Sequence, residues 1–394
     1  MNGTIYMPVG EVCSSISDTY REKKNMVTLI NTSDVLEGRV LNHERVPNSN
    51  LKGQFKKTFQ RDDILYSEIR PQNRRFAYVD FSPIDYIAST KLMVIRAKKD
   101  VVSPKYLYYF LKNSSTVAEL QLLAETRSGT FPQITFSEVA NLTIPVPPLA
   151  VQEVIVQTMQ CLEDKTICNE QINDNLEQQA QAIYHERFET VSPNDLPSDW
   201  RIVTLGEVAT ISNKSFNPLK EPEILLEHYS IPAFDEARFP VFELSTAIKS
   251  NKFIIDASCF MISKLNPTTK RVWKPYCLTG NAVCSTEFIV YKAKDKTITD
   301  FLYSVIDSNS FSDFMCSHVT GSTGSRQRAT PSDTLSYELI LPSEDELAEF
   351  QSLVSPMYAQ IRINAIENDR LKRLRDSLLP KLMSGEIDVS AVQL

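Results

Sequence analysis

The sequence predicts an α+β protein in which a unit of mixed sheet and helix, followed by a long helix, occurs twice. The first observation is a set of five short segments that recur in the same order about 196 residues later. The second is a 3–4 spacing of apolar residues over the stretches 149–189 and 344–383. A chain of 394 residues is long enough for the two to three domains that this arrangement needs.

The repeat consists of short matches, each of which would mean nothing alone. Gly10-Glu11-Val12 recurs as Gly206-Glu207-Val208, and Ala88-Ser89-Thr90 is echoed by Cys284-Ser285-Thr286. The other three matches pair 69–71 with 265–267, 135–137 with 330–332, and 144–148 with 339–343. Five matches in order at a nearly constant offset indicate a duplication whose two copies have since diverged.

The first part of each copy alternates short strand-like runs with turn signals. The clearest strands lie within 86–96 and 288–291, and the stretch 104–112 has the pattern of a helix. Pro147 and Pro148 mark the start of the first long helix, and residues 190–199 form a linker rich in turn residues. We therefore expect four segments: globular domains over 1–148 and 191–343, a central helix over 149–190, and a distal helix with a C-terminal tail over 344–394.

The two long helices are expected to pack against each other as a coiled coil. Polar Asn169, Asn364 and Asn368 interrupt the apolar stripe, and such residues fix register at some cost in stability. Pro356 predicts a kink or a late start in the second helix. In the alternative, each helix packs only on its own globular domain. The predicted seam comprises Ile155, Leu162, Ile172, Leu176, Ile183, Val354, Met357, Ile361, Leu371 and Leu378.

The acidic net charge of -7 is located mainly on these helices. Residues 151–190 contain eight acidic and two basic side chains, and residues 344–388 contain nine and six. The helices therefore carry -9, which leaves +2 for the globular parts. The overall charge does not argue against a nucleic-acid partner.

Most enzyme signatures are missing. None of the 10 glycines forms a G-x-G pair, and the chain has no phosphate loop, nucleophile elbow, H-E-x-x-H or (D/N)-P-P-(Y/F) segment. The seven cysteines form no C-x-x-C pair, so we expect reduced thiols and no metal site. The sequence lacks a signal segment and an apolar run of membrane-spanning length. We expect a cytoplasmic protein without a membrane partner.

Two alternative functions remain open at this stage. Asp62 or Asp63 followed by Glu68 resembles the clustered carboxylates of metal-dependent nucleases, although turns rich in aspartate are common before strands. A metal-dependent DNA nuclease is therefore one alternative. A coiled-coil interaction protein without a DNA role is the other.

Basic residues cluster in stretches predicted to be loops. The stretch 52–75 has seven basic and three acidic residues, and 264–274 has four basic residues and no acid. Lys and Arg can neutralise phosphates, Arg can bind guanine through two hydrogen bonds, and Gln or Asn can bind adenine in the same way. Any one of these residues could equally belong to a solvated charged face, so the prediction of DNA binding depends on the whole set. The predicted DNA-binding residues are Lys56, Lys57, Arg70, Arg74, Arg75, Arg127, Gln133, Lys264, Lys270, Arg271, Lys274, Arg326, Gln327 and Arg328.

Four segments together resemble the specificity subunit of Type I restriction–modification systems. The second of them is especially characteristic, with a Gly-Thr loop, an isoleucine strand, the run I-P-V-P-P-L and Gln152 at the start of a helix. The resemblance spans the chain, and the order and duplication of the segments make it specific. The segments are residues 63–77, 127–152, 196–208 and 374–389.

This resemblance implies two target-recognition domains that each read one half of a split double-stranded DNA sequence. It also implies that the long helices form an antiparallel coiled coil between these domains, with pseudo-twofold symmetry. Two modification subunits would bind and supply S-adenosylmethionine and adenine methylation. Restriction subunits with motor and nuclease activity, which use ATP and Mg²⁺, could join them. The resemblance implies no catalytic residue, cofactor or metal in this chain.

Overall fold

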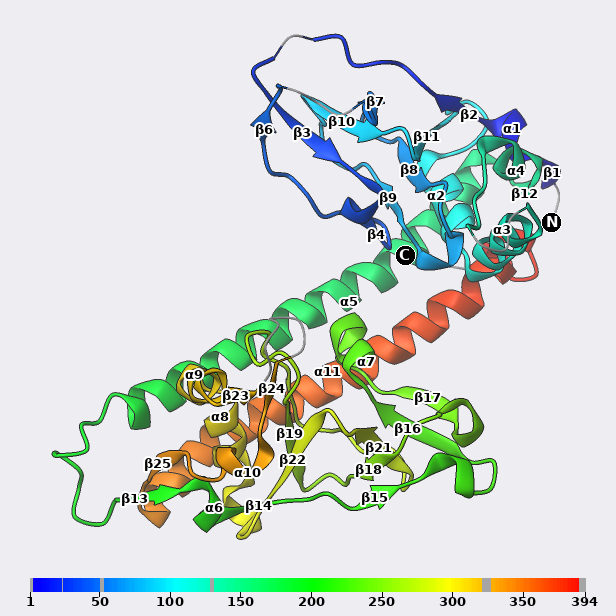
Figure 1. The fold of residues 1–394 in the computed structure, drawn as a ribbon. Helices are drawn as coiled ribbons and strands as arrows, with labels where there is room; N and C mark the ends of the chain where they lie inside the picture. Colours follow the sequence, from blue (N-terminus) through cyan, green and yellow to red (C-terminus); the bar gives the residue numbers. More distant parts are fainter. Residues whose placement is uncertain (1–2, 23, 50–52, 128–130, 321–326, 390–394) are drawn as a thin grey trace. The chain divides into compact units, whose positions relative to one another are not determined.

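The computed structural model describes residues 3–22, 24–49, 53–127, 131–320 and 327–389. The chain divides into two units (Figure 1). Unit 1 contains Met1–Lys165 and Arg370–Leu394, and unit 2 contains Thr166–Asp369. Each unit therefore combines a globular part with a portion of both long helices.

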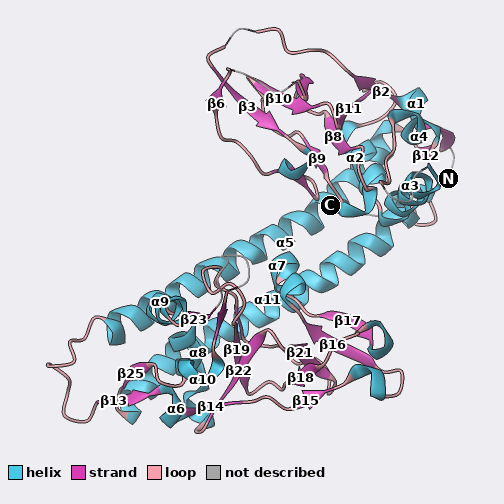
Figure 2. Ribbon diagram, viewed as in Figure 1, coloured by secondary structure: helices cyan, strands magenta, loops and turns pink. Residues whose placement is uncertain are grey.

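The globular part of unit 1 contains two four-stranded sheets and two strand pairs (Figure 2). One sheet has the order β2(Cys13–Ile16), β11(Leu92–Ala97), β8(Ile64–Ser67), β9(Phe76–Tyr78), with antiparallel neighbours throughout. The other has the order β6(Val46–Pro47), β3(Met26–Ile30), β10(Tyr86–Ser89), β7(Phe55–Lys57), and here β3 and β10 are parallel. The pairs are β1(Ile5–Pro8) with β12(Thr143–Val146) and β4(Val35–Leu36) with β5(Arg39–Val40).

Helices complete the main core of unit 1. The helix predicted over 104–112 is confirmed as α2(Pro104–Lys112), whose Tyr106 and Leu107 are fully buried. This core joins α2, one face of the sheet that contains β8 and β11, and the parts of the long helices that belong to this unit. The other helices of the globular part are α1(Val9–Val12), η1(Thr32–Asp34), η2(Pro71–Asn73), α3(Ser114–Arg127) and α4(Phe136–Asn141).

Unit 2 repeats the sheet topology of unit 1. The order β14(Ala209–Ile211), β22(Phe288–Ala293), β19(Cys259–Ser263), β20(Val272–Trp273) corresponds to that of β2, β11, β8, β9. The order β17(Val241–Leu244), β16(Leu225–Tyr229), β21(Ala282–Ser285), β18(Lys252–Ile254) corresponds to β6, β3, β10, β7, with β15(Ser215–Phe216) added at the edge. The parallel pair recurs as β16 with β21. The remaining pairs are β13(Arg201–Thr204) with β25(Glu338–Leu341) and β23(Val319–Thr320) with β24(Arg328–Ala329).

Helices α8, α9 and α10 follow β22 in unit 2 as α2, α3 and α4 follow β11 in unit 1. Phe301 and Leu302 of α8 are fully buried in the main core, as Tyr106 and Leu107 of α2 are in unit 1. The helices of this unit are α6(Leu205–Val208), η4(Pro218–Lys220), α7(Ile231–Ala237), η5(Ser245–Ala247), η6(Lys296–Ile298), α8(Thr299–Ile306), α9(Asn309–Ser317) and α10(Pro331–Thr334).

The repeated glycines occupy places where a side chain would collide with a neighbour. A Cβ on Gly10 would lie 3.0 Å from Cβ of Ala140, so α1 approaches α4 closely. A Cβ on Gly206 would lie 3.2 Å from the carbonyl oxygen of Leu335. The same close approach in both copies gives a physical reason for the Gly-Glu-Val match.

The long helices begin close to the predicted residues. The first, α5(Leu149–Tyr184), follows Pro148 and ends in a π-helical turn over His185–Glu189. The second, α11(Glu344–Ser384), continues through Pro356, so the predicted late start is wrong. Its first turn contains Glu344, Asp345 and Glu346, which favour a helix N-terminus. The hydroxyl of Ser343 accepts a hydrogen bond from the main-chain N–H of Glu346.

In each unit a portion of α5 lies beside a portion of α11, which confirms the predicted packing of helix on helix (Figure 1). In unit 2 the amide nitrogen of Asn169 donates to Glu367 at 2.7 Å and to Asn368 at 2.8 Å, and Asn364 donates to Asn173 at 2.8 Å. Residues later in α5 contact residues earlier in α11, so the two helices are antiparallel. In unit 1 the guanidinium of Arg375 lies 3.8 Å from Glu163.

The predicted seam residues differ in burial. Ile155 and Val354 are fully buried, and Leu162, Leu378, Ile183, Met357 and Ile361 are partly buried against the core of their own unit. Leu176 and Leu371 are also partly buried, whereas Ile172 keeps 40% of its surface exposed. The stripe therefore contacts both the facing helix and the globular part.

Candidate nucleic-acid interface

Three segments far apart in the sequence meet in unit 1 at the end of strand β8. The main-chain N–H of Glu68 donates to the carbonyl of Lys91 at 3.0 Å, which joins the strand end to the turn between β10 and β11. The N–H of Ile134 donates to the carbonyl of Glu68 at 2.9 Å, and that of Arg70 donates to Pro132 at 3.1 Å. The strand end, the turn and the segment before α4 therefore form one connected surface.

Unit 2 builds the same junction at the end of β19. The N–H of Lys264 donates to Glu287 at 2.9 Å, the N–H of Ala329 to Lys264 at 3.0 Å, and the N–H of Asn266 to Gln327 at 2.9 Å. The strands end alike, because the hydroxyls of Ser67 and Ser263 each accept a hydrogen bond from the N–H two residues later.

The loops that follow have the same unusual backbone. Arg70 has φ 43° and Asn266 has φ 48°, both in the left-handed region that non-glycine residues rarely adopt. Strain of this kind persists only where the surrounding structure holds it, and it gathers at functional sites. We name these two surfaces junction 1 (residues 67–70, 89–91 and 132–134) and junction 2 (residues 263–266, 285–287 and 327–329).

Equivalent side chains in the two junctions differ although the backbones agree. In junction 1 the ammonium of Lys91 lies 3.5 Å from the carboxylate of Glu68 and 3.4 Å from the amide oxygen of Gln133. Junction 2 exchanges the first two charges, with Lys264 at the position of Glu68 and Glu287 at that of Lys91. Arg328, at the position of Gln133, donates two hydrogen bonds to Glu287, at 3.0 and 3.1 Å.

The predicted DNA-binding residues of unit 1 lie in different surroundings. Lys56 and Arg70 are exposed, and among the described residues neither side chain has an ion-pair partner. Lys57 donates to the carbonyls of Thr90 and Leu92, and burial lowers its pKa against the attraction of Glu68. The other three are held by neighbours: Arg74 by Ser114 and Glu37, Arg75 by the carbonyls of Ser33 and Val35, and Arg127 by Glu138.

The predicted residues of unit 2 divide in the same way. Lys264 is partly exposed in junction 2, and no ion pair of its side chain occurs within the described parts of the chain. Arg271 pairs with Asp235 at 2.6 and 2.9 Å, and Lys274 pairs with Asp300. Gln327 and Arg328 belong to junction 2. Arg326 and the glycine loops at 128–130 and 321–326 lie outside the described residues.

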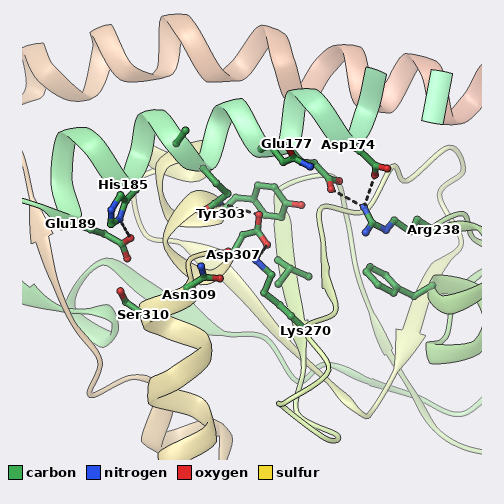
Figure 3. A pocket seen from close by; sticks show the side chains of 15 residues that line it. Asp174, Glu177, His185, Glu189, Arg238, Lys270, Tyr303, Asp307, Asn309 and Ser310 are labelled. Atoms are coloured by element: carbon green, nitrogen blue, oxygen red, sulfur yellow. Dashed lines mark hydrogen bonds and ion pairs between the residues drawn. The ribbon is translucent and has the colours of Figure 1, made fainter. Parts of the chain in front are cut away.

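Lys270, in the loop between β19 and β20, lines a cavity of about 520 Å³ together with several other charged side chains (Figure 3). Its ammonium lies 3.0 Å from the carboxylate of Asp307, whose pKa is raised by burial in spite of that cation. Arg238 pairs with Glu177 of α5 at 2.7 Å in the same cavity. The charged groups of the cavity are thus largely matched with one another.

The aspartates on which the nuclease alternative depends already have hydrogen-bond and ion-pair partners within the protein. Asp63 is fully buried and accepts two hydrogen bonds of 2.7 Å from Arg96 and one from the N–H of Gln60. Asp62 accepts from Lys99 and Tyr78, and the hydrogen bond from Lys99 lowers its pKa, with burial acting against it. Because Arg96 already neutralises Asp63 and Lys99 pairs with Asp62, the structure gives no support to the nuclease alternative.

The sequence prediction missed Lys91 and Glu287, which lie in the turns of the two junctions. The signal was present, since both directly follow the match of residues 88–90 with 284–286. Over the described part of the chain, no three His, Cys, Asp or Glu side chains form a group that could hold a metal ion. Within the same part, no helix is both long and apolar enough to cross a membrane.

Comparison with known proteins gives one consistent family. Residues 6–178 match the model of the "Type I restriction modification DNA specificity domain". The Type I restriction enzyme HindI specificity subunit of Haemophilus influenzae is 29% identical, with 92% of this chain and 94% of that protein covered. The MjaIX specificity subunit of Methanocaldococcus jannaschii is 24% identical, with 78% and 76% covered.

Solved structures share the fold over nearly the whole chain. A chain from a study of the complex assembly and conformational transition of the type I R–M system superimposes with a TM-score of 0.52, at 19% identity, covering 98% of this chain and 99% of that one. The S subunit of a Type I restriction–modification system from M. genitalium superimposes with a TM-score of 0.53, at 15% identity, covering 97% and 96%.

Proposed function

We propose that this chain, which belongs to the family of Type I restriction–modification specificity subunits, recognises a DNA sequence for a restriction–modification complex and is itself non-catalytic. The observation that supports this most directly is the pair of equivalent junctions, which present polar and charged side chains on the same backbone in two units. A relative with the name of a specificity subunit is covered over 94% of its length. The reading as an interaction protein without a DNA role explains neither observation.

We propose residues 1–148 and 191–343 as two target-recognition domains, each of which reads one half of a split sequence. The two repeated folds support this division, and the different side chains of the junctions fit two different half-sites. A half-site of a few base pairs has low specificity, and joining two of them multiplies specificity without a larger contact surface. The helical segments 149–190 and 344–394 would set the distance between the half-sites.

The partners follow from the family. A specificity subunit binds DNA and joins a complex with other restriction–modification subunits. We propose that this chain binds two modification subunits and additional restriction subunits. The complex would form in the cytoplasm, where the host DNA lies. S-adenosylmethionine, ATP and Mg²⁺ would bind to those partners and not to this chain.

Among the predicted DNA-contacting residues, Arg70 and Lys264 are the strongest candidates for phosphate contacts. Both lie in the junctions, and within the described residues neither cation is neutralised by an acid. A cation that already has a bound carboxylate has less to gain from a phosphate than one that is only solvated. Arg271 and Lys274 would have to leave Asp235 and Asp300 before they could bind DNA in the same way.

The test measures DNA binding by the complex of this chain with its modification subunit. Labelled genomic fragments are incubated with the complex in an excess of random competitor DNA, and retained fragments are sequenced. The proposed function predicts that retained fragments share one split motif. Retention without any shared motif, from a soluble and stoichiometric complex, would favour the interaction-protein alternative.

A further inference from the structure

We propose that Gln133 and Arg328 are the equivalent base-reading residues of the two recognition domains. In this assignment Gln133, held by Lys91, reads an adenine, and Arg328, held by Glu287, reads a guanine. The inference rests on the proposed function and extends it, because it names the residues and the bases that distinguish the two half-sites.

The first step of the argument is that the two positions are structurally the same. Gln133 forms a β-bridge with Ile69, and Arg328 forms one with Leu265. Each directly precedes the residue that donates to the strand end, Ile134 in junction 1 and Ala329 in junction 2. When two domains with the same backbone read different sequences, the difference must arise from side chains at equivalent positions.

The second step is the chemistry of the side chains. Base edges are read through hydrogen-bond donors and acceptors, and glutamine matches adenine as arginine matches guanine. At the flanking junction positions the residues are Glu68 with Lys91 and Lys264 with Glu287, so the supporting charges are exchanged between the copies. Each base-reading residue thus has a neighbour suited to it, a cation beside the amide oxygen and an acid beside the guanidinium.

The third step is the geometry of Arg328. Its Nε and Nη2 donate to the two oxygens of Glu287, so the ion pair uses one edge of the guanidinium. Recognition of guanine N7 and O6 can use the other edge, formed by Nη1 and Nη2. The acid therefore fixes the orientation of the arginine without competing for the same edge. The side chain of Arg328 is 45% exposed.

Gln133 is oriented by the same principle. The ammonium of Lys91 can only donate, so the group 3.4 Å away must be the amide oxygen of Gln133. That assignment leaves the amide nitrogen as a donor for adenine N7. The second lone pair of the oxygen can accept from adenine N6, which completes the bidentate contact.

The experiment compares methylomes of cells that express the modification subunit together with wild-type chain, Arg328→Ala, Arg328→Lys or Gln133→Ala. We expect both Arg328 variants to relax one G·C position in one half of the motif and to leave the other half unchanged. Gln133→Ala should relax one A·T position in the opposite half. In binding assays the discrimination at each relaxed position should fall about tenfold.

Glu287 is a positioning residue, and its variants separate positioning from general folding. Glu287→Ala should lower discrimination at the same G·C position yet raise affinity for random DNA, because an acid near the phosphates is removed. Glu287→Gln keeps one acceptor and should restore part of the discrimination. A purely structural defect would lower both kinds of binding. Lys292→Ala is the matched control, since it breaks an ion pair with Asp256 at the other end of β22.

The outcomes distinguish the two levels of the proposal. A split wild-type motif that all Arg328 and Gln133 variants retain unchanged would overturn the base-reading assignment and leave the proposed function in place. Relaxation of both halves by one variant would also overturn it, since each residue is assigned to one domain. The absence of any split motif in the wild type would overturn the proposed function together with this inference.

Discussion

Arg70 and Lys57 are both basic residues close to junction 1, but their surroundings give them different roles. Arg70 is exposed, whereas Lys57 directs its ammonium into two main-chain carbonyls. We expect Arg70→Ala to weaken binding of the complex to all DNA sequences. The slope of log affinity against log salt concentration should become shallower by about one. Stability of the free chain should stay unchanged. The measurement is affinity as a function of salt concentration.

Lys57→Met is the matched comparison for Arg70→Ala. It keeps the length of the side chain but leaves the carbonyls of Thr90 and Leu92 without this donor. We expect the free energy of unfolding to fall by about 1–3 kcal/mol, with the affinity of the folded protein for DNA unchanged. A loss of DNA affinity in Lys57→Met without a loss of stability would reverse the two assignments.

His228 should make unit 2 sensitive to acid. Burial is the main cause of its lowered pKa, which the hydrogen bond to Glu243 opposes and the nearby Lys252 reinforces. When the pH falls below the ordinary pKa, such a histidine binds a proton in the unfolded state but stays neutral in the folded state. Proton binding then stabilises the unfolded state, and the free energy of unfolding decreases. Stability should therefore decrease as the pH falls through about 6.5, the ordinary value, toward the lower folded value.

Urea unfolding between pH 8 and pH 5 tests this prediction. His228→Gln keeps a donor for Glu243 and should make the free energy of unfolding less dependent on pH over that range. His43→Gln is the control, because His43 is an exposed histidine of unit 1. Equal slopes for His228→Gln and the wild type would contradict the account of His228.

At the scale of elements, the polar residues of the helix pair make specific contacts. Asn169 is buried and donates to Glu367 and Asn368. Removing the amide leaves two partly buried acceptors without this donor, so Asn169→Ala should lower the free energy of unfolding by about 1 kcal/mol. Asn175→Ala on the same helix is the control, since Asn175 is exposed and should cost much less. Similar decreases in the free energy of unfolding for both variants would show that the hydrogen bonds of Asn169 do not stabilise the helix pair specifically.

The positions and bounds of single helices could be predicted well from local sequence patterns. Pro147 and Pro148 indicated the start of α5, the 3–4 spacing indicated both long helices, and α2 has the predicted bounds. The late start expected from Pro356 was wrong, because three acidic residues and Ser343 support the helix from Glu344 onward. A proline removes one hydrogen bond, and packing of the remaining turns can outweigh that loss.

Contacts between distant elements could not be predicted in this way. Arg271 and Asp235 are 36 residues apart, and Lys270 and Asp307 are 37 apart, so local pattern gave no sign of their pairing. The repeat was the exception, because it related positions across the chain. The match of 88–90 with 284–286 placed Lys91 and Glu287 at equivalent positions, although it did not show that their side chains would contact Gln133 and Arg328.

At the scale of the whole molecule, the helices should determine the gap between the half-sites. One heptad inserted into α5 next to Asn173 and one into α11 next to Asn364 would keep the apolar stripe in register. Seven residues lengthen a helix by about 10 Å, or about three base pairs of DNA. We expect the gap in the methylated motif to grow by about that amount. A heptad in only one helix should abolish methylation, and an unchanged gap with both inserts would contradict the spacing role.

The central claim is that this chain gives a restriction–modification complex its split DNA target. The most direct measurement is sequencing of the host methylome with the modification subunit expressed alone and together with this chain. The account predicts a motif of two half-sites with methylated adenine in each, present only when this chain is expressed. No new methylation from a soluble, associated pair of proteins would contradict it.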